Sequence, residues 1–199
     1  MPLIPIVYNS PFGHTAALAQ RVAAGVESVE GCRAPLIEAA ELPPADPETK
    51  SLGGRWDELN RADGILLGSP TYLGSVTAGF KGFMDASGPI WLNQGWKDKL
   101  AGGFTNSGSP AGDKLGAQMA MVVFAAQHSM LWVPLGLFNH PDKDINRLGG
   151  TLGPIAHSGN APTAETPPEA DRKTAELFGQ RFAEITRRWV RGDDRAEPV

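Results

Sequence analysis

Residues 10–15, Ser-Pro-Phe-Gly-His-Thr, combine residue types that can bind an anion. They lie between a short apolar run and an alanine-rich helical pattern. The first turn of a helix presents unpaired backbone N–H groups, which bind a phosphate without needing a lysine. Ser10 and Thr15 add hydroxyl donors, and Gly13 lets the backbone approach a ligand closely. The same residue types also favour an ordinary capped helix start, so this loop alone leaves both interpretations open.

Two later loops share this composition: residues 69–76, SPTYLGSV, and residues 106–112, NSGSPAG. Pro70, Tyr72 and Leu73 could lie against a flat ring while Thr71 and backbone amides reach the polar edge of that ring. The 106–112 loop offers further backbone donors. The chain contains neither GxxxxGK[ST] nor GxGxxG after its first strand, so these loops fit neither a P-loop nor a dinucleotide fingerprint. Without a basic residue in the loops, a monophosphate fits better than a pyrophosphate.

The elements around these loops alternate between strand and helix patterns. Strands are expected at 3–8, 34–37, 65–69, 99–105 and 131–137, and the main helices at 15–29, 56–62, 76–84, 115–130 and 169–190. Such alternation predicts right-handed βαβ crossovers and a doubly wound parallel sheet of order 2-1-3-4-5, with helices on both faces. Ligands of this fold bind beyond the carboxyl ends of the strands, where the three loops should meet. Pro5 fits poorly, because proline removes a donor from a central strand.

Bulk properties limit the function classes. A chain of 199 residues with 41% apolar and 20% charged residues suits one globular domain, expected over 1–192, with a charged tail at 193–199. The net charge of −4 offers no attraction for nucleic acid. A single cysteine, Cys32, excludes an intrachain disulfide, and no metal-ligand cluster stands out. Without a leader pattern or an uninterrupted apolar span, we expect a cytoplasmic protein with no membrane span.

These motifs together resemble the WrbA type of flavodoxin-like NAD(P)H:quinone oxidoreductase, a family that binds FMN. The resemblance runs from Ile6 to the final helix through SPFGHT, SPTYLGS, GFKGFMDASGPIW, FTNSGSPAG and AAQHSM, in the family's order and near its spacing. It implies FMN as cofactor, NAD(P)H as co-substrate and a homo-oligomer. The implied cofactor contacts are Ser10, Pro11, Phe12, Gly13, His14, Thr15, Pro70, Thr71, Tyr72, Leu73, Gly74, Asn106, Ser107, Gly108, Ser109, Pro110, Ala111 and His128.

The resemblance also implies roles beyond cofactor binding. His128 matches a histidine that reaches the flavin or the substrate and is the catalytic candidate. Phe12 matches an aromatic position beside the nicotinamide nucleotide, and Trp91 a tryptophan that overhangs the flavin of a neighbouring subunit. Without the resemblance, His128 would read as a structural histidine and Trp91 as a local hydrophobic plug or an interface residue.

The implied activity is a two-electron transfer from NAD(P)H to quinones, each substrate using one site in turn. A one-electron flavodoxin carrier and a non-catalytic FMN-binding module are the alternatives. The absence of carboxylates from the three loops favours the enzyme, because carriers tend to be acidic near the flavin. The chain departs from the family pattern at Pro110 and Ala111, which replace glycine-like positions, and at 149–159, GGTLGPIAHSG, where a tyrosine-sized contact is missing.

Overall fold

The computed structural model describes residues 1–49, 51–159 and 161–193. They form a parallel sheet of order β2-β1-β3-β4-β5, as predicted. The strands are β1 (Ile6–Tyr8), β2 (Leu36–Glu38), β3 (Gly64–Pro70), β4 (Leu100–Ser107), β5 (Leu131–Trp132) and β6 (Ile155–His157). Every residue of β3 and β4 is buried, as expected for strands covered on both faces. Their carboxyl ends carry the second and third of the predicted loops.

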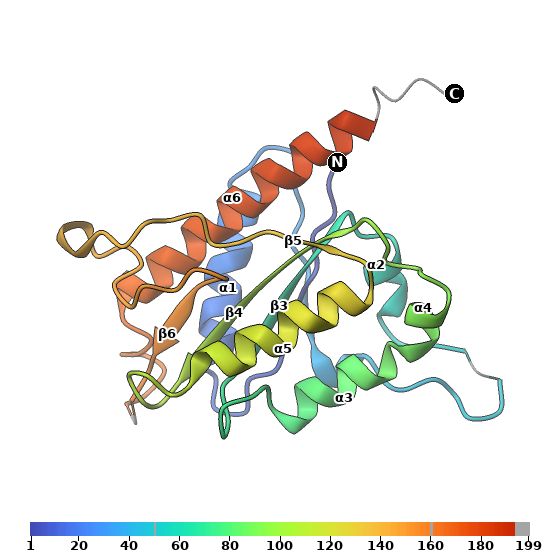
Figure 1. The fold of residues 1–199 in the computed structure, drawn as a ribbon, viewed down its shortest axis with the longest axis horizontal. Coiled ribbons are helices and arrows are strands. Elements are labelled where there is room, and N and C mark those ends of the chain that lie inside the picture. Colours follow the sequence, from blue (N-terminus) through green and yellow to red (C-terminus); the bar gives the residue numbers. More distant parts are fainter. Residues whose placement is uncertain (50, 160, 194–199) are drawn as a thin grey trace.

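Helices cover both faces of this sheet (Figure 1). On one face α1 (His14–Glu27) and α6 (Glu169–Asp193) lie side by side and bury Leu18, Val22, Phe178 and Phe182 against the strands. On the other face lie α2 (Trp56–Asn60), α3 (Ala78–Ala86), α4 (Gly88–Leu92) and α5 (Lys114–Gln127). Their core is aromatic and contains Trp56, Phe80, Phe83, Trp96 and Phe124. Short 3₁₀ turns follow β2 (Ala39–Glu41) and β5 (Pro141–Lys143).

Pro5 lies just outside the first strand, which is therefore shorter than the predicted 3–8. The backbone N–H of Ile6 donates to the Pro35 carbonyl at 2.9 Å, and the Pro5 carbonyl accepts from Leu66 N–H at 3.0 Å. The ladder thus uses the acceptor of Pro5 and needs no donor from it. Leu3 makes only an isolated bridge to Arg33. The strand that leads into the 10–15 loop is intact.

The fifth position in the sheet is shared by two strands. The start of β4 pairs with β5 through Leu100 and Ala101, and its end pairs with β6 through Thr105, Asn106 and Ser107. The strand predicted at 131–137 is therefore wrong in extent: Pro134 lacks a donor, and the chain leaves the sheet before it. Strand β6 was not among the predicted strands, because its three residues are too few to show a strand pattern. This strand brings residues 158–159 and 161–163 to the functional edge.

Several predicted helix ends also shift. The helix expected at 115–130 ends at Gln127, because His128 takes the C-cap position and Ser129 has a left-handed φ of 59°. The helix at 56–62 ends at Asn60, and the region from 76 to 92 contains two short helices instead of one. Of the tail predicted at 193–199, Asp193 ends α6 and the other residues lie outside the described part of the chain.

Candidate functional site

The three predicted loops surround one cavity of about 600 Å³ at the carboxyl edge of the sheet. This volume lies within the range of ordinary small-molecule sites. Predicted contacts that line the cavity are Ser10, Pro11, Phe12, His14, Thr15, Pro70, Tyr72, Asn106, Ser107 and Gly108. The parallel topology brings these residues together although nearly one hundred positions separate the first from the last.

The first loop leads directly into the N-terminus of α1. Gly13 is the N-cap at φ 85°, a left-handed conformation that glycine adopts without strain. Ser10 Oγ accepts from Ala16 N–H at 2.9 Å, so this serine does act as a cap. The N–H groups of His14 and Thr15 lie in the first turn, where no intrahelical acceptor exists. They remain available to an anion in the cavity.

Phe12 and Tyr72 form the apolar side of the cavity. Their ring centroids are 6.4 Å apart, and both rings are partly exposed. Burial raises the pKa of the Tyr72 phenol, which therefore stays protonated at neutral pH.

The neighbours of Tyr72 in the second loop point elsewhere. The Thr71 hydroxyl lies 2.8 Å from that of Thr105 inside the protein. Leu73 and Gly74 form a turn at φ 47° and 76°, and the Leu73 side chain is fully exposed. These three predicted ring contacts do not line the cavity.

The third loop contributes its first half to the cavity. Asn106 is 4% exposed, and its Nδ2 donates to Ser158 Oγ at 3.0 Å. Its Oδ1 is buried and has no partner among the described residues. Such an orphan acceptor is costly unless a ligand donates to it. Ser109, Pro110 and Ala111 do not line the cavity, and their carbonyls accept instead from the ammonium of Lys114.

A wall on the far side of the cavity was absent from the sequence prediction. It consists of Ser158, Gly159, Ala161, Pro162 and Thr163, which follow β6. Ala161 O lies 3.0 Å from His14 Nε2, and Gly108 O lies 3.1 Å from His157 Nε2. Two histidines therefore tie this region to the first and third loops. The only sequence signal was a small-residue segment, HSGNAPT, between a short apolar run and the proline-bearing start of a helix.

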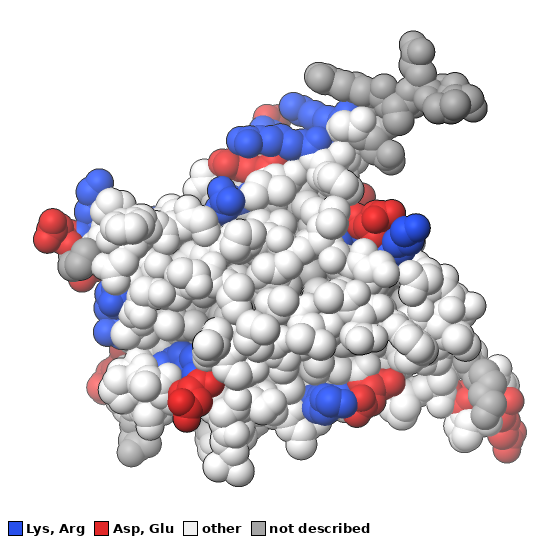
Figure 2. Space-filling view, in the orientation of Figure 1, with Lys and Arg blue, Asp and Glu red and all other residues white. Residues whose placement is uncertain are grey.

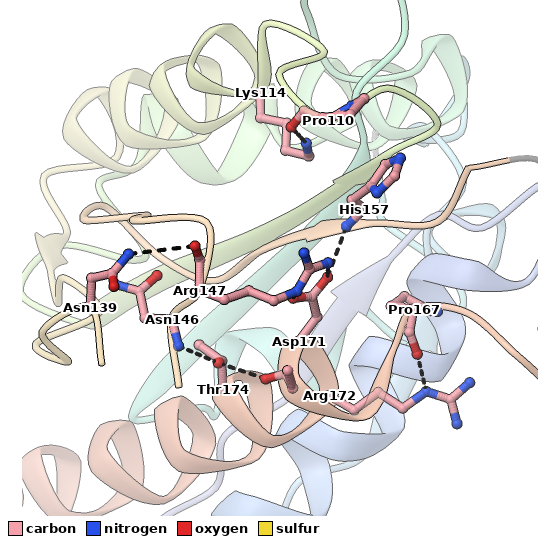
Figure 3. Close-up of polar contacts among 11 residues, drawn as sticks. Pro110, Lys114, Asn139, Asn146, Arg147, His157, Pro167, Asp171, Arg172 and Thr174 are labelled. Atoms are coloured by element: carbon pink, nitrogen blue, oxygen red, sulfur yellow. Dashed lines mark hydrogen bonds and ion pairs between the residues drawn. The ribbon is translucent and has the colours of Figure 1, made fainter. Parts of the chain in front are cut away.

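The first turns of α6 hold this wall in place (Figure 3). Asp171, 3% exposed, accepts from Arg147 Nε and Nη2 at 2.8 and 2.9 Å and from His157 N–H at 3.0 Å. Arg172 donates to the carbonyls of Thr163 and Pro167. The ion pair between Asp171 and Arg147 thus fixes β6, and Arg172 fixes the end of the wall.

The structure places His128 away from this cavity, in the aromatic core. It is 2% exposed and lies against Trp96 and Phe124, with ring centroids 4.5 and 4.8 Å away. Its Nε2 bonds to Ser87 Oγ at 2.9 Å, and burial lowers its pKa to about 4. The predicted contact with flavin or substrate is thus not made by His128 in the cavity of its own chain. The cause is that α5 ends at the opposite edge of the sheet, and the catalytic role of His128 stays a prediction.

Trp91 does not line the cavity either. It lies on α4, on the side of the molecule away from β6 (Figure 1), and is 45% exposed.

Gly13 lies close to the wall formed by the residues after β6. A Cβ at this position would lie 2.9 Å from Thr163 Cγ2, so a larger residue would push the wall away.

Comparison with known proteins assigns this arrangement to a family. The family of NADPH-dependent FMN reductases matches residues 4–143. The chain belongs to this family.

Relatives cover nearly the whole chain. Flavodoxin FldP of Pseudomonas aeruginosa is 39% identical over 185 residues, covering 90% of this chain and 94% of its own. Quinone-oxidoreductase QR2 of Triphysaria versicolor is 30% identical, with coverage of 92% and 94%. A solved flavodoxin, WrbA-like protein from Agrobacterium tumefaciens, superposes with a TM-score of 0.71 at 36% identity, covering 93% and 97%. The predicted resemblance and flavodoxin-like fold are confirmed.

Membership in the FMN reductase family also confirms the expected class, an FMN-dependent NAD(P)H oxidoreductase. Within the described part of the chain, no helix combines the length and apolar character needed to span a bilayer.

Proposed function

We propose that this protein transfers two electrons from NAD(P)H to quinones through FMN bound in the cavity. The observation that carries the proposal is that one cavity is lined by His14 and Thr15, whose backbone N–H groups lie in the first turn of α1, and by Asn106, whose buried Oδ1 has no partner among the described residues. The His14 and Thr15 N–H groups suit a phosphate at one end, and Asn106 Oδ1 suits a ring N–H at the other. FMN is a ligand that presents both groups.

The residues present fit this cofactor. FMN, when bound, supplies the capacity to take up a hydride from a nicotinamide and to pass two electrons on. The first turn of α1 would hold its phosphate, and Ser10 would add a hydroxyl donor. Asn106 and the backbone of Ser107 and Gly108 would hold the pyrimidine edge. The amide of Asn106 is oriented for this by Ser158.

Phe12 and Tyr72 would determine what approaches the ring. Their exposed faces offer aromatic surface on which a nicotinamide or a quinone can stack. The protonated Tyr72 hydroxyl can donate a hydrogen bond to a carbonyl oxygen of the substrate. Since no Asp, Glu, Lys or Arg lines the cavity among the described residues, substrate binding would depend on stacking and backbone donors.

The alternative is the one-electron carrier, which the name of the Pseudomonas aeruginosa relative keeps open. A carrier docks proteins through an acidic rim, whereas the residues that line this cavity include no carboxylate in the described part of the chain. This difference favours the enzyme.

The deciding experiment has three stages. Purified protein should show a flavin absorbance spectrum and release FMN on denaturation. Anaerobic NADH or NADPH should bleach the bound flavin, and a soluble benzoquinone should restore its colour. Initial rates against both substrates should give parallel double-reciprocal lines, as expected when they use one site in turn. Flavin that no nicotinamide bleaches would contradict the proposal.

We also propose that the protein assembles as a homo-oligomer, which would bring Trp91 to the flavin of a neighbouring subunit. The face that carries α5 is almost free of charged side chains (Figure 2). Leu115, Met119 and Val123 project from α5 at helical spacing and are 66%, 44% and 52% exposed. Trp91 and Leu92 on α4 add to this apolar surface. Patches of this kind on soluble proteins mark interfaces.

A further inference from the structure

Lys114 at the start of α5 is buried beneath the third loop. Its side chain is 3% exposed, and its Nζ donates to the carbonyls of Pro110, Ser109 and Ala111 at 2.7, 3.1 and 3.4 Å (Figure 3). An ammonium has three N–H donors and no acceptor, so these carbonyls use its full capacity. Ser107 Oγ also donates to Ser109 O at 2.8 Å. The ammonium and this hydroxyl fold the loop back from the cavity.

This buried cation has no carboxylate partner among the described residues. Asp171 is the near anion, but it forms its ion pair with Arg147. Lys114, Arg147 and Asp171 together therefore leave one uncompensated positive charge behind the third loop and β6. A buried charge without a counterion is costly, and burial accordingly lowers the pKa of Lys114. The cost of burying this charge suggests that Lys114 has a role other than stabilising the fold.

The location of Lys114 beneath the third loop indicates such a role. The cavity is lined by neither lysine nor arginine in the described residues, so no such side chain meets a ligand there directly. Asn106, Ser107 and Gly108, which line the cavity, directly precede in the chain the residues whose carbonyls hold Lys114. Negative charge that develops on a ligand at this edge is stabilised by a nearby buried cation, because the low dielectric leaves their attraction poorly screened.

We propose that Lys114 is a positioning residue that holds the third loop in its ligand-binding shape and would favour reduction of bound FMN by stabilising negative charge at its pyrimidine edge. This inference rests on the proposed function for its second part only, since the loop exists without FMN. Lys114 lies outside the cavity, yet it would supply the positive charge that a basic side chain in the loops would otherwise provide.

Lys99 provides a matched control. Its Nζ also donates to backbone carbonyls, those of Asn60 and Ala62, and burial also lowers its pKa. It lies at the start of β4, at the other edge of the sheet from the cavity. Lys99→Met therefore removes an ammonium that also donates to backbone carbonyls, from a less buried position and without touching the third loop.

The first test needs no cofactor. Hydrogen exchange of the backbone amides at 106–112 is measured in flavin-free protein, for wild type, Lys114→Met, Lys114→Gln and Lys99→Met. We expect Lys114→Met to speed exchange there about tenfold or more, which corresponds to a loss of about 1.4 kcal/mol of local stability. Lys114→Gln, which keeps two donors, should have a smaller effect, and Lys99→Met none. Unchanged exchange in Lys114→Met would overturn the loop assignment.

The second test measures affinity for FMN, oxidised and reduced, by titration of the same proteins. Lys114→Met and Lys114→Gln should both lose about tenfold in preference for reduced over oxidised FMN, which equals a midpoint shift of about 30 mV to lower potential. Because Lys114→Gln keeps donors but loses the charge, a shift in Lys114→Met alone would contradict the electrostatic role. Wild-type protein that binds no FMN would refute the proposed function, while the exchange result would still stand.

Circular dichroism checks folding throughout. Loss of folding in both Lys114 variants, with Lys99→Met folded, would show a general structural role for Lys114 and overturn the proposal.

Discussion

The side-chain amide of Asn106 has one hydrogen-bonded atom and one atom without a partner among the described residues. Its Nδ2 is held by Ser158, and its Oδ1 meets no donor in a buried position. An amide oriented in this way can tell a ligand that donates a hydrogen bond from one that does not, because the mismatch leaves a buried acceptor unpaired. The residue thus combines cavity wall and recognition group.

Asn106→Leu should weaken FMN binding by about tenfold to a hundredfold, the free energy expected for one hydrogen bond to a buried group. Fluorescence titration of FMN into the flavin-free protein measures the change. The matched control is Ser109→Ala, since Ser109 lies in the same loop but does not line the cavity. Equal losses in both variants would point to a general effect on the loop.

The buried imidazole of His128 predicts how the stability of the protein changes at low pH. Ser87 Oγ donates to Met84 O, so its lone pair accepts from the Nε2–H of His128, and Nδ1 has no partner within the described part of the chain. Protonation would place a charge at this buried atom, which explains the pKa of about 4. The folded pKa lies below the unfolded value of about 6.5, so the unfolded state binds the proton first as the pH falls.

The contribution of His128 is therefore complete above about pH 6.5 and is lost as the pH falls toward 4, by up to about 3 kcal/mol. Urea unfolding of wild type and His128→Gln between pH 4 and 7.5 measures it. The variant should show a shallower decline in the free energy of unfolding over this window. Parallel curves would show that His128 does not titrate differently in the folded state.

At the scale of elements, β6 and α6 build the wall that the loops alone do not provide. The carboxylate of Asp171 binds two parts of the chain that are distant in sequence, the Arg147 guanidinium and the His157 backbone N–H. Each is needed: without the carboxylate, Arg147 and the β6 backbone lose their acceptor together. A buried pair broken on one side costs about 3–5 kcal/mol in comparable proteins.

Asp171→Asn should therefore lower the free energy of unfolding by about 2–4 kcal/mol and increase proteolytic cleavage between 157 and 167. Urea unfolding and limited proteolysis measure the two effects. Glu169→Gln is the matched control, because Glu169 is an exposed partner of Arg21 on the same helix and should change stability by less than about 1 kcal/mol. Similar losses in the two variants would contradict the special place of Asp171.

At the scale of the whole molecule, the face that carries α5 and α4 is largely apolar. The apolar side chains of α5 and α4 lie exposed on a surface that carries few charges (Figure 2). If this face is the interface between subunits, a single charge at its centre should disrupt the assembly, because burying an unpaired carboxylate costs several kcal/mol.

Val123→Glu should therefore sediment as a smaller species than wild type at equal concentration. Gln20→Glu, which adds the same charge at an exposed position on α1 on the other face, should sediment like wild type. Sedimentation velocity over a range of concentrations measures both. A wild-type chain that remains monomeric at every concentration would refute the oligomer.

The sequence by itself determined the alternation of elements, and with it the sheet order and the edge at which residues 10–15, 69–76 and 106–112 meet. This inference works because the carboxyl ends of parallel strands must share an edge, and hydrophobic periodicity reveals the long elements. Strand β6 and the end of β5 escaped it, since two or three residues carry no period.

Only the tertiary structure decided which loop residues face the cavity. It turned Thr71 inward toward Thr105, put Lys114 beneath the third loop, and enclosed His128 among Trp96 and Phe124. It also brought residues 158–159 and 161–163 across from the first loop. These placements depend on contacts between residues far apart in the chain, where packing and buried hydrogen bonds, rather than local pattern, fix the direction of each side chain.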